Sequence, residues 1–263
     1  MSVFINGINL AFEDFGSGPA VLLIHGFPLC RKMWHPQVRT LNAAGFRVIC
    51  PDLRGFGESD APDGPYSMEI FADDMAALLD HLGIEQAVVG GMSMGGYILF
   101  NLLDRYPERI RGACFITTRA NDDDETGKLR RLTLAKEVMK FGPAIVAKVF
   151  ETLLLAEESL AERPKLAAEI YKWMTANDSR GIAGGLLAMR ERKDYNGLLS
   201  SISVPALAIG AEGDKAAPPE NAIIIASGIP GCRLSIIPHA GHMANLENPG
   251  AFNEALIGFL KSL

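Results

Sequence analysis

A serine held between glycines constrains this chain more than any other feature. It lies in Gly91-Met92-Ser93-Met94-Gly95, which follows an apolar run at 88–89 and precedes a helical pattern at 97–103. This is the G-x-S-x-G pattern of a sharp turn between a strand and a helix, in which the residues two before and two after the serine have almost no room for a Cβ. We therefore expect Ser93 to occupy a strained turn at the end of a buried strand.

A serine in such a turn is placed for nucleophilic chemistry. The first N–H groups of the following helix have no intrahelical partner, and the positive end of the helix dipole favours negative charge there. The Met94 N–H can therefore donate to a developing oxyanion. Taken alone, the pattern is also compatible with a glycine-rich turn after a buried strand, and it is the strand, turn and helix in that order that favour the catalytic interpretation.

Apolar runs alternate with helical patterns along most of the chain, which predicts an α/β fold with a mostly parallel sheet and helices on both faces. An antiparallel hairpin opens the chain and turns at Asn6-Gly7. Counting the strand that ends at the serine turn, eight strands are expected, the others at 2–5, 8–15, 19–24, 46–50, 110–116, 204–210 and 233–237. Further helices are predicted at 68–82, 219–227 and 249–260.

The alternation stops between about residues 120 and 199, where only helical patterns occur. These helices are predicted at 129–149, 145–155, 166–174 and 182–192, with the first two separated near Gly142-Pro143. We therefore predict a core made of 1–119 and 200–263, and a helical lid inserted at 120–199. Helix ends are the least certain part of such a prediction.

Composition excludes several classes of function. The net charge of −6 and the pI of about 5.4 leave no basic field for nucleic acid or an anionic membrane, so neither partner is expected. The four cysteines are dispersed without a C-x-x-C pair, which indicates neither a zinc site nor a disulfide framework. No signal peptide and no apolar span of about 20 residues are recognised, so a cytoplasmic location is expected. The oligomeric state stays open.

Two further residues can join Ser93 at one site. Asp214 and His242 each follow a predicted strand, and loops after parallel strands share one edge of the sheet. Glu212 lies two positions from Asp214 and is the alternative acid, in which case Asp214 would be a turn residue. His239 lies three residues before His242 and can serve simply to close that loop.

Taken together, these segments resemble the α/β-hydrolase superfamily over the whole chain. The matching motifs are His25-Gly26-Phe27-Pro28, the turn at 52–59, the serine turn, Gly213-Asp214, and Gly241-His242-Met243 leading into Glu247-Asn248-Pro249. Within the superfamily, the chain looks most like lid-bearing small esterases and lactonases. These include 3-oxoadipate enol-lactonases, pimeloyl-carrier-protein esterases and cofactor-free haloperoxidase-like esterases.

The resemblance implies a hydrolase with a Ser-His-Asp triad that needs no metal and no organic cofactor. Ser93 would be the nucleophile, His242 the general base and Asp214 the group that orients the imidazole. The oxyanion would lie between the backbone N–H groups of Phe27 and Met94. Related dehalogenases and epoxide hydrolases carry aspartate at the position of Ser93, so ester, lactone, thioester or C–C acyl cleavage is expected instead. The competing class is a ligand-binding protein that keeps the fold without turnover.

Other residues near the motifs receive supporting roles. His25 is expected to hold the oxyanion loop by hydrogen bonding, and Asp52 and Arg54 to stabilise their own turn by local hydrogen bonds and ion pairing. Trp34 and Met92 are candidates for the pocket wall, with plain core packing as the alternative.

The lid bears on the substrate. A helical insertion of this length can roof a pocket, so small or medium acyl compounds are expected rather than long triglycerides. Residues 121–199 contain 13 Lys and Arg and 13 Asp and Glu, so the insertion is neutral while the remainder carries the net negative charge. One group of basic residues could steer an acidic acyl carrier protein to the pocket, or could be a solvated helix face: Lys128, Arg130, Arg131, Lys136, Lys140 and Lys148.

Overall fold

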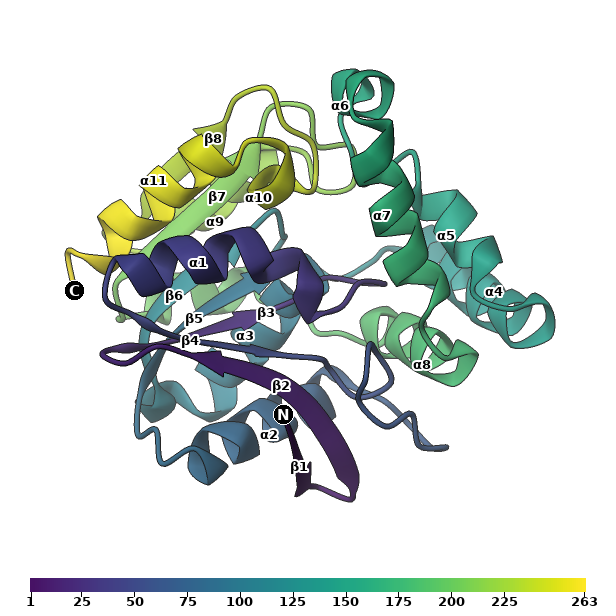
Figure 1. The fold of residues 1–263 in the computed structure, drawn as a ribbon, viewed down its shortest axis with the longest axis horizontal. Helices are drawn as coiled ribbons and strands as arrows, with labels where there is room; N and C mark the ends of the chain where they lie inside the picture. Colours follow the sequence, from purple (N-terminus) through teal and green to yellow (C-terminus); the bar gives the residue numbers. More distant parts are fainter.

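A single eight-stranded sheet organises the protein, as predicted. The computed structural model describes residues 1–263 and orders the strands β1-β2-β4-β3-β5-β6-β7-β8 (Figure 1). β1 pairs antiparallel with β2 and β2 antiparallel with β4, whereas all other neighbouring strands are parallel. The strands are β1 (Ser2–Ile5), β2 (Ile8–Phe15), β3 (Ala20–Ile24), β4 (Arg47–Pro51), β5 (Ala87–Met92), β6 (Ile110–Ile116), β7 (Ala206–Ala211) and β8 (Arg233–Ile237).

Local sequence explains how several strands begin. The opening hairpin turns at Asn6 and Gly7, whose φ angles of 46° and 78° are those of a type I′ turn. β3 begins one residue later than predicted, directly after Pro19, and β7 begins directly after Pro205. Proline has no N–H to donate to a neighbouring strand, so the ladder starts at the next residue.

The sheet has a hydrophobic core on each face. Successive residues of β3 alternate between the two cores: Leu22 and Ile24 contribute to one, and Val21 and Leu23 contribute to the other. Both faces are therefore buried, which is why the central strands are continuously apolar. One face is covered by α2 (Met68–His81), α3 (Met94–Arg105) and α9 (Glu220–Gly228), and the other by α1 (His35–Ala43) and α11 (Pro249–Leu260), which follows the short helix α10 (Ala244–Glu247). Three 3₁₀ turns lie at Arg31–Trp34, Pro107–Arg109 and Asn196–Ser201.

Five helices follow one another between β6 and β7 and lie beside one end of the sheet (Figure 1). We call them the insertion: α4 (Glu125–Phe141), α5 (Ala144–Phe150), α6 (Glu157–Glu162), α7 (Pro164–Thr175) and α8 (Ser179–Arg190). α4 starts four residues before the predicted helix, because the Asp124 side chain accepts from the Gly127 N–H at 2.7 Å and caps the helix. The predicted break is confirmed at Gly142, whose φ is 87°. α6 was not predicted.

Helix α8 approaches the core closely. A Cβ added to Gly181 would lie 1.7 Å from the Gly55 carbonyl oxygen, and one added to Gly184 would lie 2.5 Å from the Tyr66 ring. Only glycine fits at such distances, so these small residues let α8 pack directly on the loop after β4. The spacing of α8 against the core is therefore fixed by backbone contact.

One asparagine ties the insertion to two core loops. The Asn177 side chain donates to the Pro28 carbonyl oxygen at 2.8 Å and accepts from the Gly57 N–H at 2.7 Å. The residue is buried, and it lies just before α8. Its amide therefore joins the loops after β3 and β4 to the insertion.

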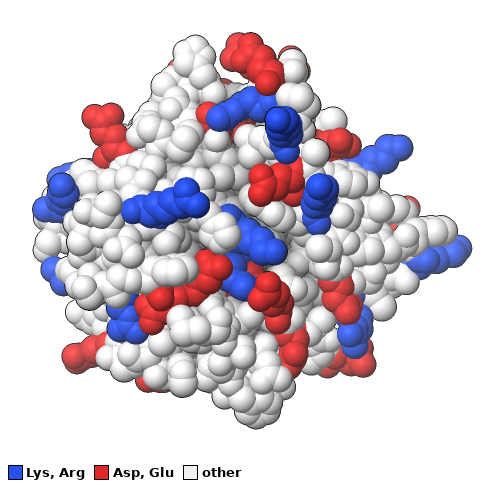
Figure 2. Space-filling model, in the orientation of Figure 1, with Lys and Arg blue, Asp and Glu red and all other residues white.

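The outer surface carries both signs of charge. Figure 2 shows Lys and Arg interspersed with Asp and Glu over the face in view. None of the helices has the length and apolar character that a bilayer-spanning segment requires.

Candidate active site

Ser93 occupies the turn between β5 and α3 in a backbone conformation that is rare for any residue other than glycine, with φ 54° and ψ −112°. A Cβ on Gly91 would lie 2.2 Å from the Gly95 carbonyl oxygen, and one on Gly95 would lie 2.4 Å from the Ile24 carbonyl oxygen. The predicted reason for both glycines is therefore confirmed. The Thr118 hydroxyl donates to the Ser93 carbonyl oxygen at 2.7 Å and helps to fix the turn.

His242 and Asp214 form a buried pair. The His242 Nδ1 lies 2.8 Å from Asp214 Oδ2 and 3.0 Å from Oδ1, and the two residues are only 2% and 4% exposed. Asp214 Oδ1 also accepts from the N–H groups of Ala216 and Ala217, both at 2.8 Å. A carboxylate fixed in this way favours the proton on Nδ1 and leaves Nε2 free to accept one.

The structure distinguishes Asp214 from Glu212, the alternative acid. Glu212 is exposed, and its carboxylate accepts from the His239 backbone N–H at 3.2 Å. His239 is also exposed and has a φ of 52°, which suits a residue that closes a loop. Asp214 is therefore the acid that meets His242, and Glu212 helps to shape the turn beside it.

Ser93 and His242 line one cavity of about 550 Å³. Its wall combines loops that follow the strands with side chains from the insertion and from the segment before it. Besides Ser93 and His242, these include Phe27, Tyr97, Arg119, Asp123, Arg131, Leu134, Phe150, Leu186, Met189 and Ala216. A second hollow, of about 630 Å³, lies between β2 and α1, and neither Ser93 nor His242 lines it.

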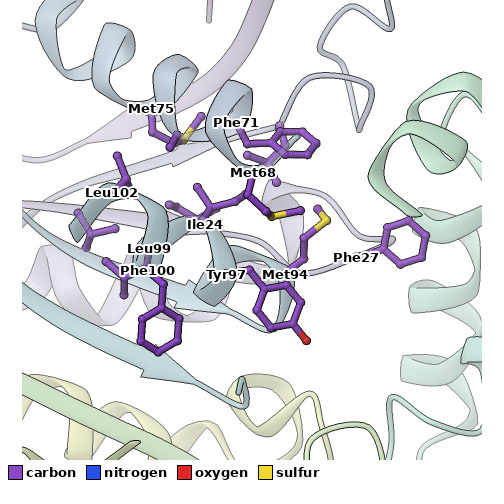
Figure 3. Close-up of a cluster of buried hydrophobic side chains, with 14 of the residues drawn as sticks. Ile24, Phe27, Met68, Phe71, Met75, Met94, Tyr97, Leu99, Phe100 and Leu102 are labelled. Atoms are coloured by element: carbon purple, nitrogen blue, oxygen red, sulfur yellow. The ribbon is translucent and has the colours of Figure 1, made fainter. Parts of the chain in front are cut away.

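The loop after β3 supplies a free amide. The Phe27 N–H donates to no other atom of the protein, and Met94 is the first residue of α3, where the N–H has no intrahelical acceptor. The Phe27 side chain points toward the insertion and lies 5.3 Å from the Phe150 ring of α5 (Figure 3). The predicted oxyanion donors thus lie in the loop after β3 and at the start of α3, at the same end of the sheet as the cavity.

His25 supports this loop. Its Nδ1 lies 2.9 Å from the Gly26 carbonyl oxygen, and its Nε2 accepts from the Leu53 N–H at 3.0 Å. Complete burial lowers the pKa of His25, so the ring stays neutral and can both donate and accept. The side chain joins the loops after β3 and β4.

Comparison with known proteins agrees with this geometry. The chain matches the family model described as the alpha/beta hydrolase fold over residues 19–249. It belongs to the α/β-hydrolase family. A thermophilic esterase from Thermogutta terrifontis, solved with malate bound, is 38% identical with a TM-score of 0.95, covering 99% of this chain and 96% of that one. The enol-lactonase from Burkholderia xenovorans LB400 is 29% identical with a TM-score of 0.93, covering 99% and 100%.

Some relatives are longer proteins. Bifunctional epoxide hydrolase 2 of Sus scrofa is 27% identical over 97% of this chain, which spans only 54% of that protein. The chain thus spans about half the length of this relative. The structural neighbours of matching length place this α/β hydrolase in the small esterase and lactonase group.

The predicted pocket residues Trp34 and Met92 do not line the cavity of this α/β hydrolase. Both are fully buried in the core on the α1 and α11 face, where the Trp34 ring lies 6.4 Å from the ring of Phe252. Met92 was predicted to line the pocket because it precedes Ser93 in sequence. Successive residues of a strand point to opposite faces of the sheet, so the neighbour of a site residue can point away from the site.

The predicted local hydrogen bonds of the turn at 52–59 are confirmed for Asp52, whose carboxylate accepts from the Glu58 N–H at 2.9 Å, but the ion pairs are not local. Asp52 pairs with Arg31 and also accepts from the Arg31 backbone N–H at 2.7 Å. Arg54 instead makes two hydrogen bonds of 2.7 Å to Asp74 in α2. Local hydrogen bonds and ion pairs to residues distant in sequence therefore both stabilise the turn after β4.

Glu247 belongs to the matching motif Glu247-Asn248-Pro249, but the sequence analysis gave it no role. It is 8% exposed, and its two carboxylate oxygens accept from the Gly241 N–H at 2.9 Å and the Ala156 N–H at 2.8 Å. Gly241 precedes His242, and Ala156 precedes α6. This carboxylate therefore links the histidine loop to the insertion. No spacing pattern in the sequence indicates such a link.

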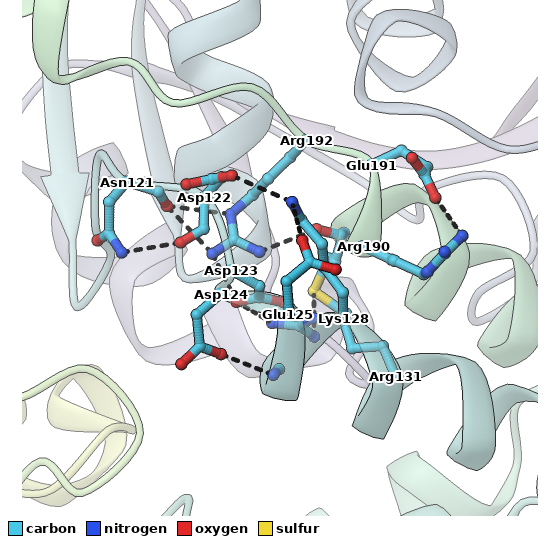
Figure 4. Close-up of polar contacts among 12 residues, drawn as sticks. Asn121, Asp122, Asp123, Asp124, Glu125, Lys128, Arg131, Arg190, Glu191 and Arg192 are labelled. Carbon is cyan, nitrogen blue, oxygen red and sulfur yellow. Dashed lines mark hydrogen bonds and ion pairs between the residues drawn. The ribbon is translucent and has the colours of Figure 1, made fainter.

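A buried ionic cluster supports the cavity wall beside α4. Asp123 accepts from Arg192 at 2.8 Å and also pairs with Arg131 (Figure 4). Burial raises the pKa of Asp123, but hydrogen bonds from the two guanidinium groups outweigh that effect and leave it well below its usual value. Arg192 also stacks over the Tyr97 ring at 4.4 Å. The cluster joins the start of α4 to the end of α8.

Proposed function

We propose that this α/β hydrolase is a serine esterase that cleaves carboxylic esters or lactones of small or medium acyl compounds. One observation carries the proposal: Ser93 in its strained turn and His242 paired with Asp214 line the same cavity. The esterase and enol-lactonase neighbours support this reaction class.

In the proposed mechanism, His242 Nε2 takes the proton of the Ser93 hydroxyl as its oxygen attacks the substrate carbonyl carbon. The oxyanion is stabilised by the N–H groups of Phe27 and Met94. The imidazolium, supported by Asp214, then protonates the leaving alcohol as the C–O bond breaks. Water, activated by the same histidine, hydrolyses the acyl-enzyme and frees Ser93.

The cavity supports small substrates. Its volume of about 550 Å³ is within the range of sites for small molecules, and α4, α5 and α8 contribute to its wall. In this proposal the insertion acts as a lid that keeps water from the reacting ester. An enol-lactone is a further candidate substrate because a lactone is an internal ester and an enol-lactonase has the same fold.

A carrier-protein substrate receives less support than a free ester. Lys128 pairs with Asp122 at 3.5 Å and with Glu125 at 3.2 Å, and Arg131 pairs with Asp123. Two of the six basic residues that could attract an acidic carrier are thereby neutralised. The remaining cations lie on a surface that also carries acidic residues.

Two experiments test the proposal. A serine-reactive phosphonate should label Ser93, detected by peptide mass spectrometry, and abolish esterase activity. Nitrophenyl esters of increasing chain length, assayed beside an enol-lactone and a thioester, should show a preference for short or medium acyl chains. Labelling of another residue would refute the mechanism, and a preference for emulsified long-chain triglyceride would refute the small-substrate claim. Ligand binding without hydrolysis of any ester would support the non-catalytic alternative.

A further inference from the structure

The cavity wall contains one semi-buried cation without a carboxylate partner. Four basic side chains line the cavity: Arg119, Arg130, Arg131 and Lys215. Arg131 pairs with Asp123, and Lys215 pairs with Glu157 at 2.6 Å. Arg130 is exposed and can be hydrated. Arg119 is left as the shielded cation whose charge no acidic residue neutralises at contact distance.

Arg119 also has an unused donor. Its Nη2 donates to the Ala216 carbonyl oxygen at 3.3 Å, but its Nε is buried and finds no acceptor in the protein. A buried donor left without an acceptor is unfavourable, so most such groups in native proteins have a partner. The Arg119 side chain itself lines the cavity, so its guanidinium group can meet a ligand oxygen there.

The pKa of the neighbouring Tyr97 indicates a positive electrostatic potential around its hydroxyl group. Tyr97 is 5% exposed and lines the same cavity. Burial raises the pKa of Tyr97, but Arg192, Arg119 and Arg131 together outweigh burial and lower it. A group of this kind loses its proton more easily only where negative charge is favoured. An anion beside Tyr97 and Arg119 would experience the same field.

The acidic residues of the wall are engaged elsewhere. Asp123 holds two arginines, Asp122 lies 3.5 Å from Lys128, and Asp124 caps α4 (Figure 4). Each carboxylate that lines the cavity therefore has a donor of its own and does not compete for Arg119.

We propose that Arg119, together with the Tyr97 hydroxyl, forms a subsite that binds a carboxylate carried by the substrate. The preferred substrates are then esters or lactones that keep one free carboxylate while Ser93 attacks the ester carbonyl. A guanidinium suits this task because its planar donors match a carboxylate. Arg119 positions the substrate and takes no part in bond making. This inference rests on the proposed esterase function.

Matched pairs of esters test the subsite. 4-Nitrophenyl hydrogen glutarate, which carries a free carboxylate on the acyl side, is compared with its neutral methyl ester. 4-Acetoxybenzoate, with the carboxylate on the alcohol side, is compared with methyl 4-acetoxybenzoate. The wild-type enzyme should prefer the charged member of at least one pair by about 10-fold or more in kcat/KM, the effect of one hydrogen bond to a charged group. No preference in either pair would overturn the proposal.

Substitution of Arg119 locates the effect. Arg119→Gln should lower kcat/KM for the preferred charged ester by about 10–100-fold, mainly through KM, and change the neutral ester by less than about threefold. Arg119→Lys should restore part of the preference. Lys136→Gln removes an exposed positive charge of α4 that does not line the cavity, and it should leave the preference between the two esters intact. Equal loss on charged and neutral esters would show that Arg119 only holds the Ala216 loop, and would overturn the subsite.

A binding measurement separates this inference from the esterase function. Calorimetric titration of Ser93→Ala with glutarate requires no chemistry, and Arg119→Gln in that background should weaken binding by about 10-fold or more. If no ester is hydrolysed, the esterase proposal fails while this titration still tests the subsite. If neutral esters are hydrolysed and Arg119→Gln leaves glutarate binding unchanged, the subsite fails and the esterase proposal stands.

Discussion

The loops that follow the strands and the helices of the insertion contribute to the cavity in different ways. In the loops, backbone groups fix the reactive side chains: glycines shape the turn of Ser93, and two N–H groups hold Asp214. In the insertion, side chains such as Leu186 and Met189 form the wall and an ionic cluster supports it. We infer that the loops determine the chemistry and supply the charged subsite at Arg119, whereas the insertion limits the size of the substrate that fits. A side chain can be substituted without altering the path of the backbone. The insertion should therefore tolerate substitutions at the cavity better than the loops do.

Removal of Ser93, the proposed nucleophile, should cause the largest loss of activity. Ser93→Ala is expected to lower kcat for a nitrophenyl ester by about 10⁴-fold or more. Adding His242→Ala should cost little further, because residues that act as one unit have non-additive effects. Steady-state kinetics with circular dichroism as a folding control would measure both. Retained activity in Ser93→Ala would place the chemistry outside the loops.

The acid that supports His242 can be identified by two matched variants. Asp214→Asn should lower kcat by about 10³–10⁴-fold, because an amide does not enforce the proton on Nδ1 or stabilise the imidazolium. Glu212→Gln, two residues away, should retain nearly full activity because that carboxylate is exposed and contacts only a backbone N–H. The reverse result would reassign the acid.

Within the insertion, the ionic cluster should matter for stability. Asp123→Asn leaves Arg131 and Arg192 without their shared carboxylate and is expected to lower the free energy of unfolding by about 3–5 kcal/mol. Asp122→Asn, where the pair is more exposed, should cost about 0–1 kcal/mol. Urea denaturation at pH 7 compares the two. Similar values for both variants would mean that the cluster is no stronger than a surface pair.

The same cluster predicts a pH dependence. The pKa of Asp123 is lower in the folded protein than its usual value of about 3.9, so protonation is disfavoured by folding. The contribution of Asp123 to the free energy of unfolding is fully present above about pH 4. It is lost as the pH falls toward the lower pKa that Asp123 has in the folded protein. The difference in unfolding free energy between wild type and Asp123→Asn should therefore be constant near neutral pH and shrink only in acid. A difference that shrinks between pH 6 and 8 would contradict this assignment.

The close contact of α8 should give a smaller effect. Gly181→Ala forces a Cβ against the Gly55 carbonyl oxygen and should lower the free energy of unfolding by about 1–3 kcal/mol. Gly258→Ala in α11 is the control, because its Cβ would meet nothing within 4 Å and alanine favours the helix by about 1 kcal/mol. Thermal unfolding measures both. If Gly181→Ala were neutral, α8 would be less firmly seated than the backbone contact indicates.

The smallest effect is expected from the exposed cations. Replacing Arg130 and Lys136 by Glu should change kcat/KM for a neutral nitrophenyl ester by less than about twofold, as for most surface substitutions. An acyl-carrier-protein ester is the comparison substrate. A loss confined to that ester and larger at low salt would restore carrier docking as the function of this surface.

Sequence alone predicts the parts of this molecule that depend on local backbone rules. The Asn6-Gly7 hairpin and the glycines around Ser93 are examples, because φ > 0 and missing space for a Cβ leave a direct signature. The local hydrogen bond of Asp52 was predicted, but the ion-pair partners of Asp52 and Arg54 were not, because Arg31 and α2 come near only in the folded chain.

The cavity wall shows the same limit. Trp34 is apolar and close to a motif, but its side chain points into the core, and the direction of a side chain depends on how elements pack. Arg119 has no sequence signature, since its role as the unneutralised cation depends on which other charges have found partners. Tertiary contacts decide both cases.

The bridge made by Glu247 bears on the route by which substrate enters. It ties the chain just before α6 to the loop of His242, whereas no residue of α6 or α7 lines the cavity. Among the exposed lining residues, Asn121, Asp124, Thr126, Arg130 and Val149 belong to α4, α5 and the segment before α4, whereas Lys215 belongs to the loop after β7. We infer that the substrate enters and the products leave on the α4 and α5 side, where most of the exposed lining residues lie. Movement of α4 or α5 would widen this entrance, while the hydrogen bonds of Glu247 would keep the chain before α6 and the His242 loop in place.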